Sequence, residues 1–173
     1  MAARTEETID TIASPVCRLR PAAWGGAAIE TGSLRAVLRQ GGVRISELYR
    51  VTRNAEVMTA AGTTIAVRLA GLGGLWTRPD SRRQGCSTRL EGVMLRRSLR
   101  EGYQVAVLFC LPPLVDHYRH RGWIMGLPVT YQQPASPAPV SCAPPLTAGL
   151  RRLDEALPPV SELRAIAIAG LPW

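Results

Sequence analysis

At 173 residues, 46% of them hydrophobic, the chain is long enough to form one compact domain with its own core. It has no apolar run of the length needed to cross a bilayer, and the polar, acidic stretch Met1 to Asp10 lacks the pattern of a signal peptide. We therefore expect a soluble cytoplasmic protein with no membrane partner.

The net charge of +8 comes from arginine alone, because the chain contains no lysine. The arginines are spread from Arg4 to Arg164 without a long basic block, and few aromatic residues lie among them. This distribution disfavours a nucleic-acid partner and suits an anionic small ligand equally well. Neither a metal site nor a disulfide framework is expected, because the four cysteines are scattered and lack a histidine at metal-ligand spacing: Cys17, Cys86, Cys110 and Cys142.

The first half of the chain is expected to contain an arm, a helix and a β-hairpin. Residues 1–15 are predicted to be a loose arm, followed by a single domain over residues 16–173. Apolar residues recur at near-helical spacing in residues 27–40, and two glycines follow, which predicts a short helix. Strand-like runs at 43–57 and 63–77 flank a turn, which predicts the hairpin. Within the second run, Gly71, Gly73 and Gly74 indicate a bulge or a close approach by another backbone or a ligand.

The second half begins with a βαβ unit. An amphipathic helix is predicted over residues 85–100 and a buried strand over 103–111, parallel to the strand that precedes the helix. A second helix over 112–122 and a strand over 123–132 follow, and residues 134–148 read as an irregular proline-rich loop. The C-terminal segment, residues 149–173, is expected to hold a short helical turn at 151–156 and a last strand.

The sequence PDSRRQGCSTRL, residues 79–90, lies between the end of a predicted strand and the start of a predicted helix. The first turn of a helix has backbone N–H groups without intrahelical partners, and this is a favourable place for an anion. Arg82 and Arg83 add positive charge beside those groups. The stretch therefore indicates a phosphate ligand.

Two motifs resemble the GNAT superfamily of acyl-CoA-dependent N-acyltransferases. Residues 82–87, RRQGCS, are similar to its pyrophosphate signature Q/R-x-x-G-x-G/A, with Ser87 in the last place. LVDHYRHRGW is similar to its F-Y-x-x-x-G-F helix end, with Tyr118, Gly122 and Trp123 at the matching positions. The similarity covers a core of about residues 45–131. Within the superfamily, the chain most resembles aminoglycoside 2'-N-acetyltransferase-like members.

The resemblance implies an α/β (α+β) fold, the GNAT acyl-CoA N-acyltransferase fold, with a mixed central sheet, splayed parallel strands and flanking helices. Acetyl-CoA is the implied co-substrate, its pantetheine arm lying along the separated strands. Arg83 stands where the family often has glycine, and it would be strained if that position needs a positive φ. The implied cofactor-binding residues are Leu75, Trp76, Thr77, Arg82, Arg83, Gln84, Gly85, Cys86, Ser87 and Thr88.

The implied chemistry is direct attack of a primary amine on the thioester. Tyr118 matches the tyrosine that often protonates the departing thiolate in the family. The general base stays open among Glu47, His117 and the α-carboxylate of Trp173. The acceptor is expected to be a small molecule, and acidic residues ahead of the motif are too few for a dedicated aminoglycoside enzyme. A homodimer is left open, and a degenerate GNAT-fold protein that binds acyl-CoA or a partner without turnover is the alternative.

Overall fold

A computed structural model describes residues 6–14, 17–19, 28–30, 33–132, 139–141 and 146–170. The chain divides into two compact units, and strands β5 (Val43–Thr59) and β6 (Thr64–Thr77) contribute residues to both. Unit 1 comprises residues 1–51 and 72–97, and unit 2 comprises residues 52–71 and 98–173. None of the helices in the described ranges combines the length and apolar character needed to span a membrane.

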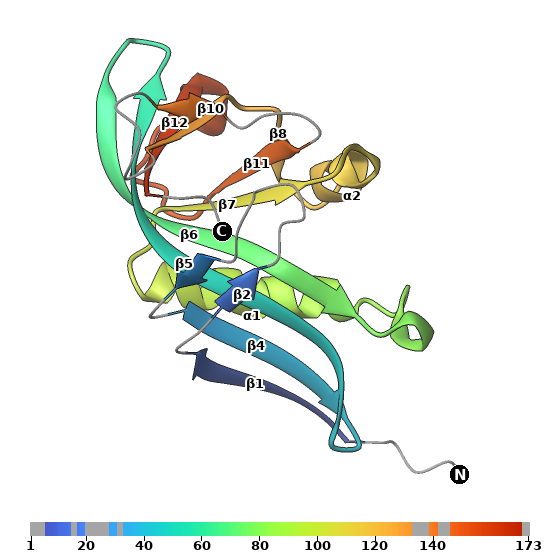
Figure 1. The fold of residues 1–173 in the computed structure, drawn as a ribbon. Helices are drawn as coiled ribbons and strands as arrows, with labels where there is room; N and C mark the ends of the chain where they lie inside the picture. Colours follow the sequence, from blue (N-terminus) through green and yellow to red (C-terminus); the bar gives the residue numbers. More distant parts are fainter. Residues whose placement is uncertain are drawn as a thin grey trace. The chain divides into compact units, whose positions relative to one another are not determined.

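The sheet of unit 1 is antiparallel. Strand β1 (Glu7–Ser14) pairs over its whole length with β4 (Ser33–Gln40), and β4 pairs on its other edge with β5. A separate two-stranded antiparallel sheet pairs β2 (Cys17–Leu19) with β3 (Ala28–Glu30). Helix α1 (Cys86–Arg100) lies along the sheet (Figure 1), and the described side chains of β1 contact it through the ion pair of Glu7 with Arg89.

Two predictions for the secondary structure of the N-terminal region are wrong. Residues 7–14 are not a loose arm, because all eight pair with β4. The helix predicted over 27–40 is replaced by β3 and β4, and β4 is hydrogen-bonded on both edges. Both faces of that strand are buried, as the burial of Leu34, Val37 and Leu38 shows. A short run of buried apolar residues can be a helix or a strand, and the spacing of its residues alone does not distinguish them. The boundary of the expected domain at residue 16 stays a prediction.

The sheet of unit 2 has the strand order β10-β9-β12-β5-β6-β7-β11-β8. It is mixed, because β12 (Leu163–Ala169) runs parallel to β9 (Val129–Gln132), whereas β11 (Thr147–Arg152) runs antiparallel to β7 (Val105–Cys110). In Figure 1 the arrows of β6 and β7 point the same way, as the predicted βαβ unit requires. Splaying of these strands stays a prediction, since the end of β6 belongs to unit 1.

The remaining predicted elements of the chain are confirmed in part. The hairpin of β5 and β6, helix α1, strand β7 and the last strand β12 are present. The second helix is shorter than predicted: a 3-10 turn, η2 (Pro112–Leu114), leads into α2 (Val115–Arg119), and the segment ends at Gly122 with φ +80°. Gly126, with φ +87°, and Pro128 split the strand predicted over 123–132 into β8 (Ile124–Met125) and β9.

Two further predictions for the C-terminal half need correction. The helical turn predicted at 151–156 is wrong, because Arg151 and Arg152 complete strand β11, whose six residues all pair with β7. A turn follows, in which the backbone N–H of Ala156 donates to the carboxylate of Asp154 at 2.9 Å. Within the predicted irregular loop, β10 (Val140–Ser141) pairs with β9; residues 133–138 and 142–145 lie outside the described ranges.

Candidate functional site

The loop between β6 and α1 in unit 1 is the site that the motif predicts. After Thr77 the chain forms a 3-10 turn, η1 (Pro79–Ser81), and then a turn that delivers the backbone to the start of α1 at Cys86. The entry is anchored by the N–H of Arg78, which donates to the carbonyl of Ile45 at 2.8 Å. The first intrahelical bond runs from the N–H of Arg89 to the carbonyl of Gly85 at 3.1 Å. The N–H groups at the preceding helical positions therefore have no acceptor within the helix.

Backbone conformation in this loop is left-handed at two positions. Arg83 has φ +62° and is the non-glycine residue with positive φ among those that the structure describes. Gly85 has φ +75°, and a Cβ placed there would meet nothing within 4 Å. The turn therefore requires a positive φ at Arg83, a conformation that glycine adopts without strain, and it keeps open space in front of Gly85.

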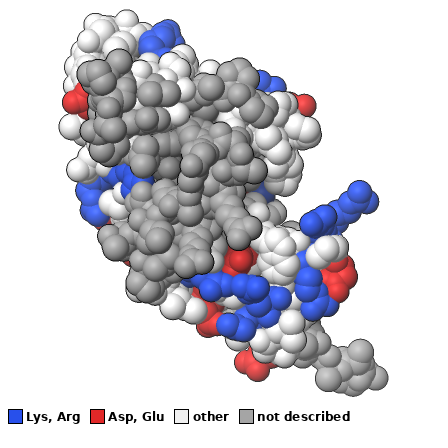
Figure 2. All heavy atoms as spheres, viewed as in Figure 1, with Lys and Arg blue, Asp and Glu red and all other residues white. Residues whose placement is uncertain are grey.

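Positive charge surrounds the loop. Arg82 and Arg83 are exposed, and neither forms an ion pair with another described residue; the Nε of Arg82 donates to the carbonyl of Thr77 at 3.2 Å. Arg78 binds Asp80, and its hydrogen bond lowers the pKa of that carboxyl to about 2. In Figure 2, arginines project from the edge of the molecule that carries this loop in Figure 1. Exposed guanidinium groups beside a helix N-terminus suit an anionic ligand.

The predicted residues at the end of β6 are held against β5. The buried hydroxyl of Ser46 lies 2.7 Å from the carbonyl oxygen of Trp76, to which it donates, and 2.8 Å from the hydroxyl of Thr77. The guanidinium of Arg44 lies over the Trp76 ring, 5.3 Å from its centre. Gly74 has φ +61°, a conformation that fits the irregularity predicted for this glycine-bearing strand. These contacts fix the last residues of β6 just before the loop.

Glu47, a candidate general base, lies in an ion-pair cluster of unit 1. Its Oε2 accepts a hydrogen bond from the Nε of Arg35 at 3.0 Å and another from Arg44 at 2.9 Å. The carboxylate is largely buried, with 15% of the side chain exposed, and Arg35 also lies over the ring of Tyr49. Two guanidinium groups therefore hold this carboxylate in place, and its role as the general base stays a prediction.

The other candidates for the chemistry lie in unit 2 or outside the described residues. Tyr118 is buried in α2, with its ring edge-on to Trp123 at a centroid distance of 6.2 Å. His117 is exposed, and its Nε2 lies 2.8 Å from a guanidinium nitrogen of Arg121, which donates to it. Trp173 lies outside the described residues. The predicted role of Tyr118 beside the loop of unit 1 stays a prediction.

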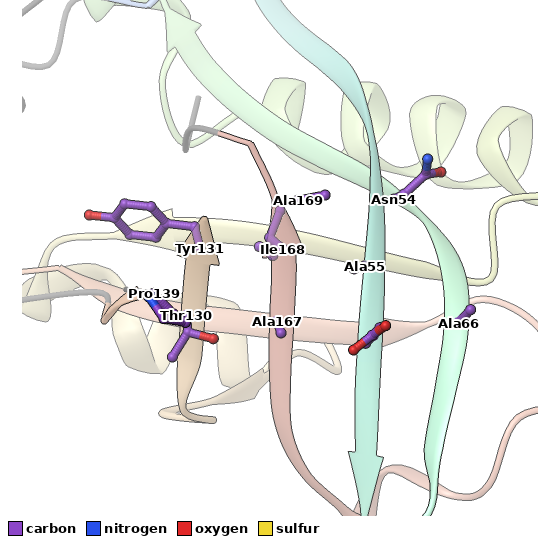
Figure 3. Close-up of a pocket in the computed structure, with 10 residues that line it drawn as sticks. Asn54, Ala55, Ala66, Thr130, Tyr131, Pro139, Ala167, Ile168 and Ala169 are labelled. Atoms are coloured by element: carbon purple, nitrogen blue, oxygen red, sulfur yellow. The ribbon is translucent and has the colours of Figure 1, made fainter. Parts of the chain in front are cut away.

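Unit 2 also contains a pocket that the sequence did not reveal. It has a volume of about 300 Å³ and lies over strands β5, β6, β9 and β12, with Pro139 at one side (Figure 3). Its side chains are mostly small, and Asn54, Glu56 and Thr130 supply the polar groups. The alternation of Asn54 and Glu56 on β5 was the available signal, but the partner strand that faces them comes from the far end of the chain.

No protein-family model matches the sequence, and no curated protein matches it. Solved structures do. A crystal structure from Lactobacillus plantarum, described as that of an N-acetyltransferase, is 19% identical in sequence. It has a TM-score of 0.53, and the match covers 86% of this chain and 99% of that one. The Escherichia coli GNAT family N-acetyltransferase YhbS, solved in complex with CoA, is 16% identical, with a TM-score of 0.50 over 79% of this chain and 66% of that one.

This chain has the GNAT acyl-CoA N-acyltransferase fold. The predicted α/β (α+β) class with a mixed sheet is thus confirmed. A GCN5-related N-acetyltransferase from Kribbella flavida is 21% identical with a TM-score of 0.44, and the match covers 54% of this chain but only 22% of that chain. At these identities the likeness to GNAT structures concerns the fold, and activity is a separate question.

Proposed function

We propose that the protein is an acyl-CoA-dependent N-acyltransferase that transfers an acetyl or other acyl group to a primary amine of a small molecule. The observation that carries this proposal is the loop of residues 82–88, where two exposed arginines and an open glycine surround the start of α1. Pyrophosphate needs donors and positive charge, and this loop supplies both.

The residues fit CoA as follows. Backbone N–H groups at the start of α1 would donate to the pyrophosphate, and the guanidinium groups of Arg82 and Arg83 would neutralise it. When bound, acetyl-CoA supplies the acyl group as a thioester. The hydroxyl of Tyr118 is proposed to give its proton to the sulfur as the carbon–sulfur bond breaks and the carbon–nitrogen bond forms. The proton lost by the amine goes to a base that we leave open among Glu47, His117 and the α-carboxylate of Trp173, directly or through water.

For the acceptor, the basic balance of the chain favours a neutral or acidic amine-bearing metabolite. The finer likeness to aminoglycoside 2'-N-acetyltransferases remains a hypothesis that an acceptor panel with aminoglycosides tests. A homodimer and the absence of a nucleic-acid partner are also kept as proposals. A protein that binds acyl-CoA without turnover is the second candidate, and the arginine in a left-handed position of the loop favours it.

The first experiment measures the melting temperature of the protein with and without saturating CoA and acetyl-CoA, since a ligand that binds the folded state raises its stability. Gly85→Asp would place a carboxylate against the pyrophosphate and is expected to abolish the shift. The matched control is Gly62→Asp, because Gly62 has φ +80°, has the same open space and lies in the turn between β5 and β6. An equal shift in wild type and Gly85→Asp would refute the loop assignment. Thiol release with the amine panel then separates turnover from binding alone.

A further inference from the structure

The pocket over β5 and β12 contains a carboxylate with no partner among the described residues. Glu56 is exposed, and the structure gives it neither a hydrogen bond nor an ion pair. The described carboxylates of Glu7, Asp10, Glu47, Asp80 and Asp116 each pair with arginine. Glu155 and Glu162 are also exposed without an ion pair, but Glu56 is the acidic side chain that lines this pocket beside small apolar residues, where it can meet a cationic ligand.

The arginines near this pocket are engaged elsewhere. Arg68, on β6 close to Ala66, lies over the Tyr103 ring at 4.5 Å and donates to the carbonyl of Glu101 at 2.9 Å. Arg53 donates to the carbonyl of Thr52 at 2.9 Å. Neither guanidinium contacts Glu56, so no arginine in the described part of the chain neutralises this carboxylate.

Strand register explains how the pocket forms around Glu56. Ala167 on β12 pairs with Glu56 on one side and with Thr130 on the other, so the three side chains form a row on one face of the sheet. Asn54 and Ala169, two residues along their strands, share that face (Figure 3). Because alanine is short, the row is hollow between Glu56 and Thr130, which lie two strand spacings or about 10 Å apart.

We propose that this pocket binds a small organic monocation, a primary ammonium with a short apolar body. The ammonium would donate to the carboxylate of Glu56 and to the amide oxygen of Asn54, and the body would lie on the alanine methyl groups. About 300 Å³ is at the lower end of the range for small-molecule sites, or roughly ten water volumes. A metal ion is a poorer match, since the described residues place no group of three metal-ligating side chains together. The inference is independent of acyl transfer.

The test is titration of the full chain with n-hexylamine, n-hexanol and hexanoate, followed by calorimetry and by backbone amide NMR shifts. Hexylamine is expected to bind most tightly and to shift the amides of Ala66 and Ala167. Glu56→Gln should raise its Kd about three- to tenfold, because part of the ion-pair energy is screened at an open site. The matched control is Glu155→Gln, which removes one exposed carboxylate elsewhere in the same unit and should leave the Kd unchanged.

Two further measurements separate the contribution of the charge from that of the apolar hollow. Hexanol should bind wild type and Glu56→Gln equally, while Ala167→Leu should fill the hollow and abolish binding of both ligands, with melting curves confirming that the variants fold. Raising the salt concentration should weaken hexylamine binding only. The proposal is overturned if hexylamine does not bind, if it binds no better than hexanoate, if Glu56→Gln leaves its Kd unchanged, or if the shifted amides lie elsewhere.

Discussion

Replacing Arg83 by glycine should stabilise the protein. Arg83 has φ +62°, a conformation that costs an L-residue about 1–2 kcal/mol and costs glycine nothing. Glycine loses about 0.5–1 kcal/mol more backbone entropy on folding, so a net gain of about 0.5–1 kcal/mol remains. For a chain of this length, that gain corresponds to a rise in melting temperature of about 1–4 °C.

The assay is paired thermal and urea unfolding of wild type, Arg83→Gly and Arg82→Gly. Arg82 is the matched control, because it is also exposed and carries the same charge but has φ −70°, where glycine brings the entropic cost and removes the side-chain hydrogen bond to the carbonyl of Thr77. Arg82→Gly should therefore lower the free energy of unfolding by at least about 0.5–1 kcal/mol. If both variants lose stability equally, the left-handed strain assigned to Arg83 is refuted. CoA titration of the same proteins shows whether the guanidinium of Arg83 or its backbone conformation matters more for binding.

Three other outcomes follow from the structure. Tyr118→Phe should lower kcat about a hundredfold with little change in CoA affinity if its hydroxyl is the general acid, and an unchanged kcat would remove that role. The pKa of Asp80 lies below its usual value, so its pairing with Arg78 stabilises the fold above about pH 4 and is lost as the pH falls towards 2; melting curves should show a smaller acid loss in Asp80→Asn. Burial raises the pKa of the Cys110 thiol, so iodoacetamide at pH 7 should label it slowly until the protein unfolds, as peptide mapping would show.

The parts of the fold that could be predicted are those with strong local signals. The hairpin of β5 and β6, helix α1 and strand β7 are bounded by Gly62, Gly85 and Gly102, which all have positive φ in the structure. Strand β4 was predicted as a helix because its identity depends on hydrogen bonds to β1 and β5. Pairing between distant segments overrides local propensity, and no sequence window of one strand contains it.

The candidate sites also differ in how well a local stretch of sequence predicts them. The arginine-bearing loop is one continuous stretch, so its charge and its glycine could be anticipated from residues 79–90. The strain at Arg83 was implied only by the resemblance to sequences that often have glycine at that place, and the structure shows the positive φ. The pocket around Glu56 could not, because its row of side chains is assembled from β5, β9 and β12. Glu47 was one of three candidate bases in the sequence, and its two arginine partners were not foreseen: Arg35 lies on the paired strand β4, and Arg44 lies three residues earlier on β5.

The use of arginine as the sole basic side chain besides histidine has a consequence for pH tolerance and labelling. Guanidinium groups stay charged at any pH at which a protein stays folded. The ion pairs described here are therefore lost only when their carboxylates are protonated, and alkaline pH does not break them.

Without lysine, the protein also offers no side-chain amine to an activated acyl group. Acylation of an added amine can therefore be measured against a background free of lysine self-modification, and any acyl group found on a side chain must be attached through sulfur, oxygen or imidazole nitrogen.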